Sequence, residues 1–242
     1  MPSPAANQLT RRHRAQVIAV GRAVVRPVRA TAGRASVGDV DSWFDSVLDR
    51  LLHIIRGGWV TSRTLGDRYV REHARVEGRA VVPEPALWVP DRVTTSLRVT
   101  GPVEFKRHLE LTGNETAAKR VMAKTMSASA QRHALAGERD TVAQTAAASD
   151  VIVGWRRVTD GNPCAFCAML AGRGAVYGQT SVHFDAHDGD ECTAEPLYEH
   201  EDEPETVLAL QEQWRQATAG TSGKAALRAW RRHWDEQRGS DG

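Results

Sequence analysis

The residues of this chain that could carry chemistry gather in one passage. Cys164 and Cys167 form a Cys-x-x-Cys pair after an Asn-Pro turn, and the third cysteine, Cys192, follows with 24 residues in between. Thiolates and imidazoles bind zinc in a tetrahedron, and a Cys-x-x-Cys turn supplies two of the four ligands. If the later segment folds back as a loop, His187 and Cys192 complete the set. The spacing therefore predicts a structural Cys₃His metal site.

Other ligands are available in the same passage. His183 could replace His187, and Asp188 and Asp190 offer either oxygen ligands or hydrogen-bond partners for an imidazole. Plain buried cysteines without a metal are also compatible with this pattern.

Two reactive interpretations stay open as well. A thioredoxin-like redox pair needs a cation that lowers a thiol pKa, and Arg157 on the preceding segment is the nearest one. A nucleophile with its base could come from Ser181, His183 and Asp185, although a catalytic triad is defined in space and not by adjacency in sequence.

The overall composition is ordinary for a globular protein. Of the 242 residues 41% are hydrophobic and 26% are charged, and no apolar run approaches the roughly 18 residues of a membrane span. The start, MPSPAANQLTRRHRAQ, has no apolar segment behind its positive charge, which disfavours a signal peptide, while an acid-free leader also fits a transit peptide. Without an export signal, three cysteines argue against a disulfide framework.

Charge is unevenly distributed, although the formal net charge is only +2. Residues 1–38 carry seven arginines and no acid, whereas residues 185–205 carry ten acids and neither lysine nor arginine. Such blocks are typical of solvated segments, but a basic one can also bind nucleic acid or an acidic protein surface. We predict a basic N-terminal arm, helical or disordered, whose candidate nucleic-acid contacts are Arg11, Arg12, Arg14 and Arg22.

Helical periodicity begins after a small, polar linker. In DVDSWFDSVLDRLLHIIRGG, residues 39–58, apolar side chains recur every three to four positions, which predicts an amphipathic helix that ends at Gly57-Gly58. A second helix from Thr61 to Arg75 would pack against the first as an antiparallel hairpin.

Prolines then interrupt the pattern. Three of them between residues 83 and 90 predict an extended connection. Residues 102–136 return to helical patterning in two pieces that divide near Gly113-Asn114, and residues 139–150 predict another short helix.

The period changes before the cysteines. Residues 151–158, VIVGWRRV, predict a strand that leads into the cysteine turn, with residues 175–178 as its partner. Two C-terminal helical segments follow the acidic loop, and their tryptophans, Trp214, Trp230 and Trp234, favour helix packing, with a partner anchor as the alternative.

The predicted fold is therefore mainly α. It has a helical N-terminal body, a small α+β Cys/His knuckle near residues 150–199, and C-terminal helices. The expected division is an arm at 1–38, a helical domain at 39–137, a knuckle module at 138–200 and a helical tail at 201–242.

One passage carries a family resemblance. The residues GWRRVTDGNPCAFCAMLAGRGAVY, followed by HFDAHDGDECTAEPLYE, resemble the C-terminal knuckle of phage minor head proteins of the Mu F-like head-morphogenesis family, in its actinobacteriophage branch. The likeness covers roughly residues 138–199. It matches Cys164 and Cys167 to the first cysteine pair of that family, His187 to its histidine, and Cys192 to its final cysteine.

The chain also departs from the family pattern. Asp190 stands where the first cysteine of a Cys-x-Cys run would fall, and Asp185 and Glu191 stand where relatives often have histidine. Either the site has lost ligands, or Asp190 supplies an oxygen in place of a sulfur.

The resemblance implies a minor capsid protein of the phage head. It would associate with the portal in the prohead interior, be made in the host cytoplasm, and contact the major capsid or scaffold protein and phage DNA, with a structural zinc and no membrane. Relatives are also labelled capsid maturation proteases, so a prohead protease is the alternative function. A free-standing zinc-ribbon DNA-binding protein is a third interpretation.

Overall fold

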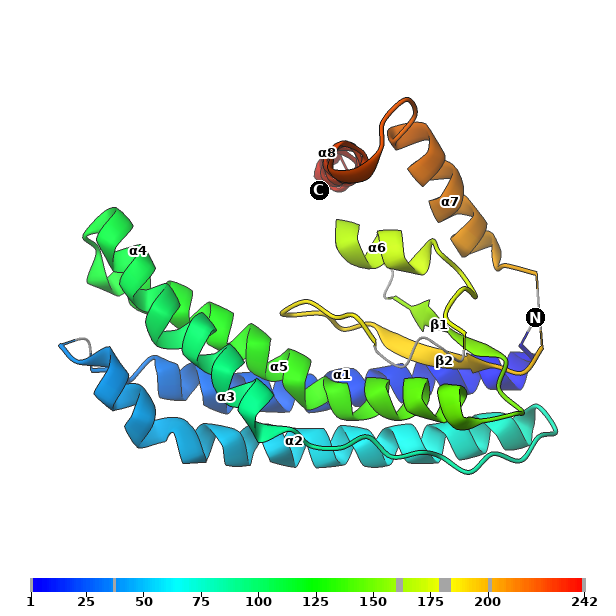
Figure 1. The fold of residues 1–242 in the computed structure, drawn as a ribbon, viewed down its shortest axis with the longest axis horizontal. Coiled ribbons are helices and arrows are strands. Elements are labelled where there is room, and N and C mark those ends of the chain that lie inside the picture. The colour runs from blue at the N-terminus through cyan, green and yellow to red at the C-terminus, as the bar shows by residue number, and fades with distance from the viewer. Residues whose placement is uncertain (1, 37, 160–162, 179–183, 200–201, 241–242) are drawn as a thin grey trace.

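The computed structural model describes residues 2–36, 38–159, 163–178, 184–199 and 202–240. Its long axis is a bundle of three helices, α1 (Pro4–Ala32), α2 (Val40–Val76) and α5 (Glu115–Ala148), which lie lengthwise side by side (Figure 1). The predicted mainly α class is confirmed. None of the described helices is long and apolar enough to cross a membrane.

Helix α1 corrects the prediction of a separate basic arm. It continues past Pro27 to Ala32 and buries one face, including Val17, Val24 and Val28, against the other two long helices. The hydrophobic pattern is weak because small and polar residues such as His13 share this buried face. Sequence periodicity consequently understated how much of α1 belongs to the core.

Helix α2 corrects the predicted hairpin, because a single helix runs through Gly57-Gly58. Gly58 is buried where α1 and α5 both approach α2: a Cβ added there would lie 3.0 Å from Ala134 Cβ and would collide with Val24 Cγ2. The glycine therefore allows close helix packing and does not end the helix.

The predicted extended connection is confirmed between α2 and the next helix. The backbone N–H groups of Glu84 and Ala86 donate to the hydroxyls of Thr145 and Thr141, which fastens this segment along α5. The elements that follow are α3 (Pro90–Arg98), the π-helical turn η1 (Val99–Val103) and α4 (Glu104–Thr112).

The predicted division near Gly113-Asn114 is confirmed. Gly113 ends α4 with a left-handed φ of 62°, and the Asn114 side chain accepts from Ala117 N at the start of α5. However, α5 then runs without a break to Ala148. The expected short helix at 139–150 is the last part of α5, and the boundary placed between residues 137 and 138 falls inside it.

A small sheet and three short helices lie over one end of the bundle (Figure 1). Strand β1 (Gly154–Val158) pairs antiparallel with β2 (Thr193–Leu197), and Tyr177 adds only an isolated bridge to Trp155. The strand prediction is confirmed, but its partner is β2 and not residues 175–178. The helices are α6 (Ala165–Ala171), α7 (Glu205–Ala217) and α8 (Gly223–Ser240).

Buried polar contacts fix the sheet to the bundle. The Glu195 carboxylate of β2 accepts from Thr10 Oγ1 of α1 at 2.8 Å and from Arg156 Nε of β1 at 2.6 Å. Each of these side chains is at least nine-tenths buried. Because breaking a buried charge pair leaves an uncompensated charge, these contacts specify how the sheet sits on the helices.

Candidate metal centre

The cysteine pair is positioned by the start of α6. Cys164 is the N-cap residue, and its Sγ accepts from the backbone N–H of Cys167 at 3.4 Å. An N-cap side chain and the residue three positions later lie on the same side of the first helical turn. This local geometry explains why a Cys-x-x-Cys spacing brings the two sulfurs together.

The second pair of candidate ligands is carried by a loop that rests on α5. Asp190 N donates to His187 O at 3.1 Å, which closes a turn with Gly189 at a φ of 83°. Gly189 N in turn donates to Ala128 O of α5 at 3.2 Å. The loop therefore folds back over the helix, as a shared site with the first cysteine pair requires.

His187 joins the two segments. Its Nε2 lies 2.9 Å from Cys164 Sγ and 3.4 Å from Cys167 Sγ, and its Nδ1 lies 2.8 Å from the backbone carbonyl of Asp188. An Nδ1–H donated to that carbonyl orients the ring so that Nε2 points at the sulfurs, where it could bind a metal once its proton is displaced, as in metal-binding histidines.

Cys192 lies on the other side of Cys167. The ligand atoms of Cys164, Cys167 and His187 are all within 4.8 Å of one another, and so are those of Cys167, Asp190 and Cys192. The four predicted ligands line one cavity of about 200 Å³. Two ligands of a tetrahedral zinc are about 3.5–3.8 Å apart, from its bond lengths of about 2.0–2.3 Å. Cys164, Cys167 and His187 therefore lie close enough together to hold one zinc ion, whereas Cys192 is grouped with Cys167 and Asp190 and not with the other two.

The cluster favours a thiolate even before a metal is considered. The hydrogen bond between Cys164 and Cys167, followed by the one between Cys164 and His187, lowers the pKa of Cys164 to about 4, although partial burial opposes this shift. The bond with Cys164 raises the pKa of Cys167 and raises the pKa of His187 to about 9. One sulfur is thus ionised at neutral pH, and a metal would displace the remaining protons.

The carboxylate of Asp190 is already paired within the protein and is not free to bind a metal. Its Oδ2 accepts from Arg157 Nη1 at 3.1 Å, and its Oδ1 accepts from Cys192 N at 2.7 Å and lies 3.4 Å from Arg139 Nη2. The carboxylate and both guanidinium groups are at most 1% exposed. Both oxygens are engaged, so Asp190 is placed to shape the loop that carries His187 and Cys192.

Sequence reasoning missed Arg139 as part of this site. Its Nε donates to Cys192 O at 2.8 Å and its Nη2 to Asp190 O at 2.6 Å, so α5 holds the ligand loop directly. No sequence signal separates Arg139 from Arg120 and Arg132 on the same Ala-rich helix. Arg157, considered as a cation for a redox pair, binds Asp190 and the carbonyl of Asp185 instead.

Two residues of the alternative interpretations cannot be placed. Ser181 and His183 lie outside the described residues, so neither the triad with Asp185 nor the substitute ligand is tested by the structure.

The predicted nucleic-acid contacts lie on α1. Arg11, Arg12 and Arg22 are exposed and Arg14 is half-buried. Arg12 Nη2 is 3.4 Å from Glu72 Oε2, and Arg22 Nε is 3.9 Å from an oxygen of Glu191.

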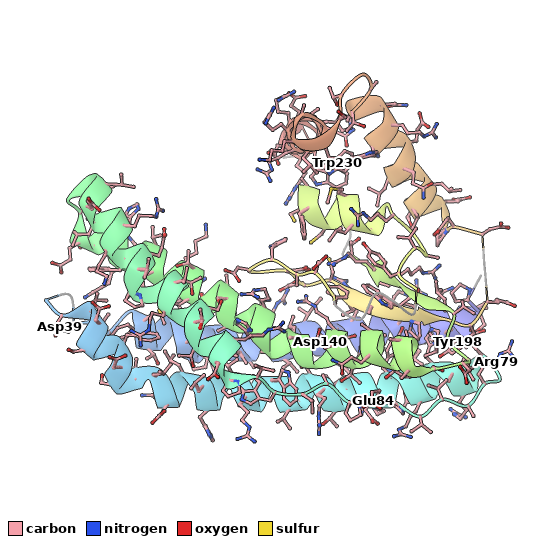
Figure 2. All side chains as sticks on the ribbon, viewed as in Figure 1. Asp39, Arg79, Glu84, Asp140, Tyr198 and Trp230 are labelled. Carbon is pink, nitrogen blue, oxygen red and sulfur yellow. The ribbon has the colours of Figure 1, made fainter. Side chains whose placement is uncertain are left out.

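The C-terminal tryptophans attach α8 to the start of α6 and to Pro163, which precedes it. Trp230 Nε1 donates to Ala165 O at 2.6 Å, and Trp234 Nε1 donates to Pro163 O at 2.8 Å. Trp230 lies on the side of α8 that faces α6 (Figure 2) and also contacts Trp214 of α7. The prediction that these residues serve helix packing is confirmed.

Comparison with known proteins places the chain in a phage protein family. Residues 4–217 match the family described as VG15 protein, so the match spans the bundle, the sheet, the cysteine cluster and α7. No curated protein and no solved structure matches the chain. On the match over residues 4–217, the chain belongs to the VG15 protein family of phages.

Proposed function

We propose that this protein is a minor capsid protein that takes part in phage head morphogenesis, in the prohead interior next to the portal. The observation that carries the proposal is the convergence of Cys164, Cys167 and His187 in the passage that resembles the knuckle of Mu F-like minor head proteins. Membership of a phage family supports the same conclusion at a coarser level.

The metal in this proposal is a structural zinc. Cys164 and Cys167 would hold it from the start of α6, and His187 and Cys192 from the loop on α5. When bound, zinc supplies a cross-link between the start of α6 and the loop on α5. A small module with little core gains folding stability from such a link.

The long bundle offers surfaces for other head proteins. Large apolar side chains are exposed on its connection and tip, with Val82 and Leu87 82% exposed and Leu111 68% exposed. Val82 and Leu87 on the connection after α2, and Leu111 on α4, are candidate contact points for such proteins. The proposed partners are the portal protein and the major capsid or scaffold protein.

Purified virions test the proposed location. Quantitative mass spectrometry should find this chain in few copies per particle, and a nonsense mutation in its gene should lower the yield of DNA-filled heads. The same lysate complemented with the intact gene is the control. Intact virions of normal yield that lack the chain would contradict the proposal.

Contact with packaged DNA is part of the proposal for α1. Because α1 is a bundle helix, deleting it would disrupt the core, and point substitutions are the appropriate test. Replacing Arg11, Arg12, Arg14 and Arg22 by glutamine should weaken binding to duplex DNA and lower its dependence on salt. Unchanged affinity with unchanged salt dependence would remove α1 from the DNA-contacting surface.

A capsid maturation protease is the second candidate function. The 2.9 Å contact between Cys164 Sγ and His187 Nε2 favours it, because a thiolate beside an imidazolium is the arrangement of a cysteine nucleophile. The sharing of His187 with a second sulfur favours metal binding instead. Co-expression with the major capsid protein discriminates: a shortened product that persists when zinc is chelated, but is lost in Cys164→Ala, His187→Ala or Ser181→Ala, would establish the protease.

A further inference from the structure

Helix α8 has two unlike faces. Trp230 and Ala226 are buried and Trp234 is partly buried, all on the side that packs against α6 and α7. Because both indole N–H groups donate hydrogen bonds to the carbonyls of Pro163 and Ala165, α8 is held in one orientation. Its opposite face is therefore presented at a fixed place.

That opposite face is basic. At 3.6 residues per turn, four exposed cations fall within an arc of about 100° centred away from the tryptophans, and they extend over about 12 Å of helix. They are Lys224, Arg228, Arg231 and Arg232. Arg238 lies instead toward the cysteine cavity, where it reaches the carbonyl of Pro163 at 3.5 Å. Asp235 lies within the same arc and Glu236 at its edge.

Among the residues that the structure describes, none of these four cations forms an ion pair. On α1, by contrast, Arg12 and Arg22 lie near carboxylates. A row of unpaired cations on a rigidly held helix fits a polyanion whose charges are regularly spaced.

We infer that the outward face of α8 binds the phosphate backbone of double-stranded nucleic acid. The inference deepens the proposed function, because packaged DNA is the polyanion inside a phage head. It adds a second DNA-contacting surface besides that of α1. This surface and the helical bundle lie on opposite sides of the cysteine cluster. Duplex DNA carries one charge per about 1.7 Å of axis, so a helix stretch of about 12 Å lies alongside more phosphates than it has cations.

Fluorescence anisotropy with a labelled 20-base-pair duplex of arbitrary sequence tests this on the full zinc-loaded chain. Four cations less Asp235 leave about three net contacts on α8, so its contribution to the slope of log K against log salt is about −2.7, or a weakening of about 40-fold between 50 and 200 mM salt. The variant carries Lys224→Gln, Arg228→Gln, Arg231→Gln and Arg232→Gln. We expect it to bind at least about tenfold more weakly at 100 mM salt and to lose most of that slope.

The control variant removes the same charge elsewhere. It carries glutamine at four exposed arginines of α2 and the turn after it, Arg50, Arg56, Arg75 and Arg79. Circular dichroism and zinc content should be unchanged in both variants, since all eight side chains are exposed. An α8 variant that binds DNA as the α2 variant does would overturn the inference.

A competing partner is separated by the choice of probe. Polyglutamate of equal charge presents an acidic protein-like surface without phosphates. Binding of polyglutamate through α8, with no binding of duplex DNA, would assign the face to an acidic protein and refute the nucleic-acid assignment. Neither result touches the presence of the chain in virions, so failure here is distinct from failure of the proposed function.

Discussion

Replacing Asp190 by asparagine tests whether this carboxylate is a metal ligand or the counter-ion of two buried arginines. The substitution keeps the size of the side chain and removes its charge. Burial alone raises the pKa of Asp190, but the charges of Arg139 and Arg157 outweigh it and the net pKa is lowered. The stabilising charge is therefore fully present above the usual carboxyl pKa, including at neutral pH.

The magnitude follows from the burial of all three groups. Asp190, Arg139 and Arg157 are at most 1% exposed, and the carboxylate oxygens lie 3.1 and 3.4 Å from the two guanidinium groups. Removing one partner of a buried ion pair costs about 3–5 kcal/mol, because the remaining charge is left uncompensated. We expect the Asp190→Asn variant to lose that amount of unfolding free energy while still binding about one zinc per chain.

Urea unfolding at pH 7 with saturating zinc, together with elemental analysis of the purified variant, measures both quantities. The matched control is Asp188→Asn. Asp188 pairs with Arg132 at 2.7 Å, but these side chains are 35% and 29% exposed, so its removal should cost only about 0–1 kcal/mol. Loss of zinc in Asp190→Asn, or a cost no larger than that of the control, would refute the assigned role.

Three further predictions follow from the same structure. Gly57 is at an exposed helical position with open space around it, so Gly57→Ala should raise the unfolding free energy by about 1 kcal/mol. Gly58→Ala should lower it by about 1–2 kcal/mol, because no Cβ fits there. Equal effects of the two substitutions in thermal unfolding would contradict a continuous α2. Burial lowers the pKa of His133 to about 4, so the unfolded chain binds a proton at this residue before the native protein does as pH falls from 6.5 towards 4. Relative to His133→Gln, the native protein should lose about 2 kcal/mol of unfolding free energy between pH 7 and 5 in urea titrations. Parallel pH profiles of the two proteins would argue against this. Zinc at about 1,000 times its dissociation constant should stabilise the native chain by about 4 kcal/mol over the chelated form, and this difference should vanish, with the bound zinc, in Cys164→Ser.

Local chemistry is what could be predicted from the sequence. The helical class, the division at Gly113-Asn114 and the strand before the cysteines depend on periodicity and on capping residues within a few positions of each other. The meeting of the first two sulfurs is also local, since an N-cap and its third following residue share one helical turn. These features depend on neighbouring residues and not on contacts with distant parts of the chain.

Contacts between distant segments decided the rest. Gly57-Gly58 reads as a helix end until α1 and α5 are seen to press against Gly58, where no Cβ fits. The arginine-rich start reads as an arm until its small and polar residues are seen to be buried in a bundle.

Asp190 shows the same division between sequence and fold most clearly. The sequence determined that a carboxylate stands beside the candidate ligands, where the knuckle that this passage resembles has a sulfur. Only the tertiary structure decided what the carboxylate does, because Arg139 comes from α5 and Arg157 from β1, 51 and 33 positions away, and both reach it in a buried site. Electrostatic pairing depends on distance in space and on burial, and neither is encoded by spacing along the chain.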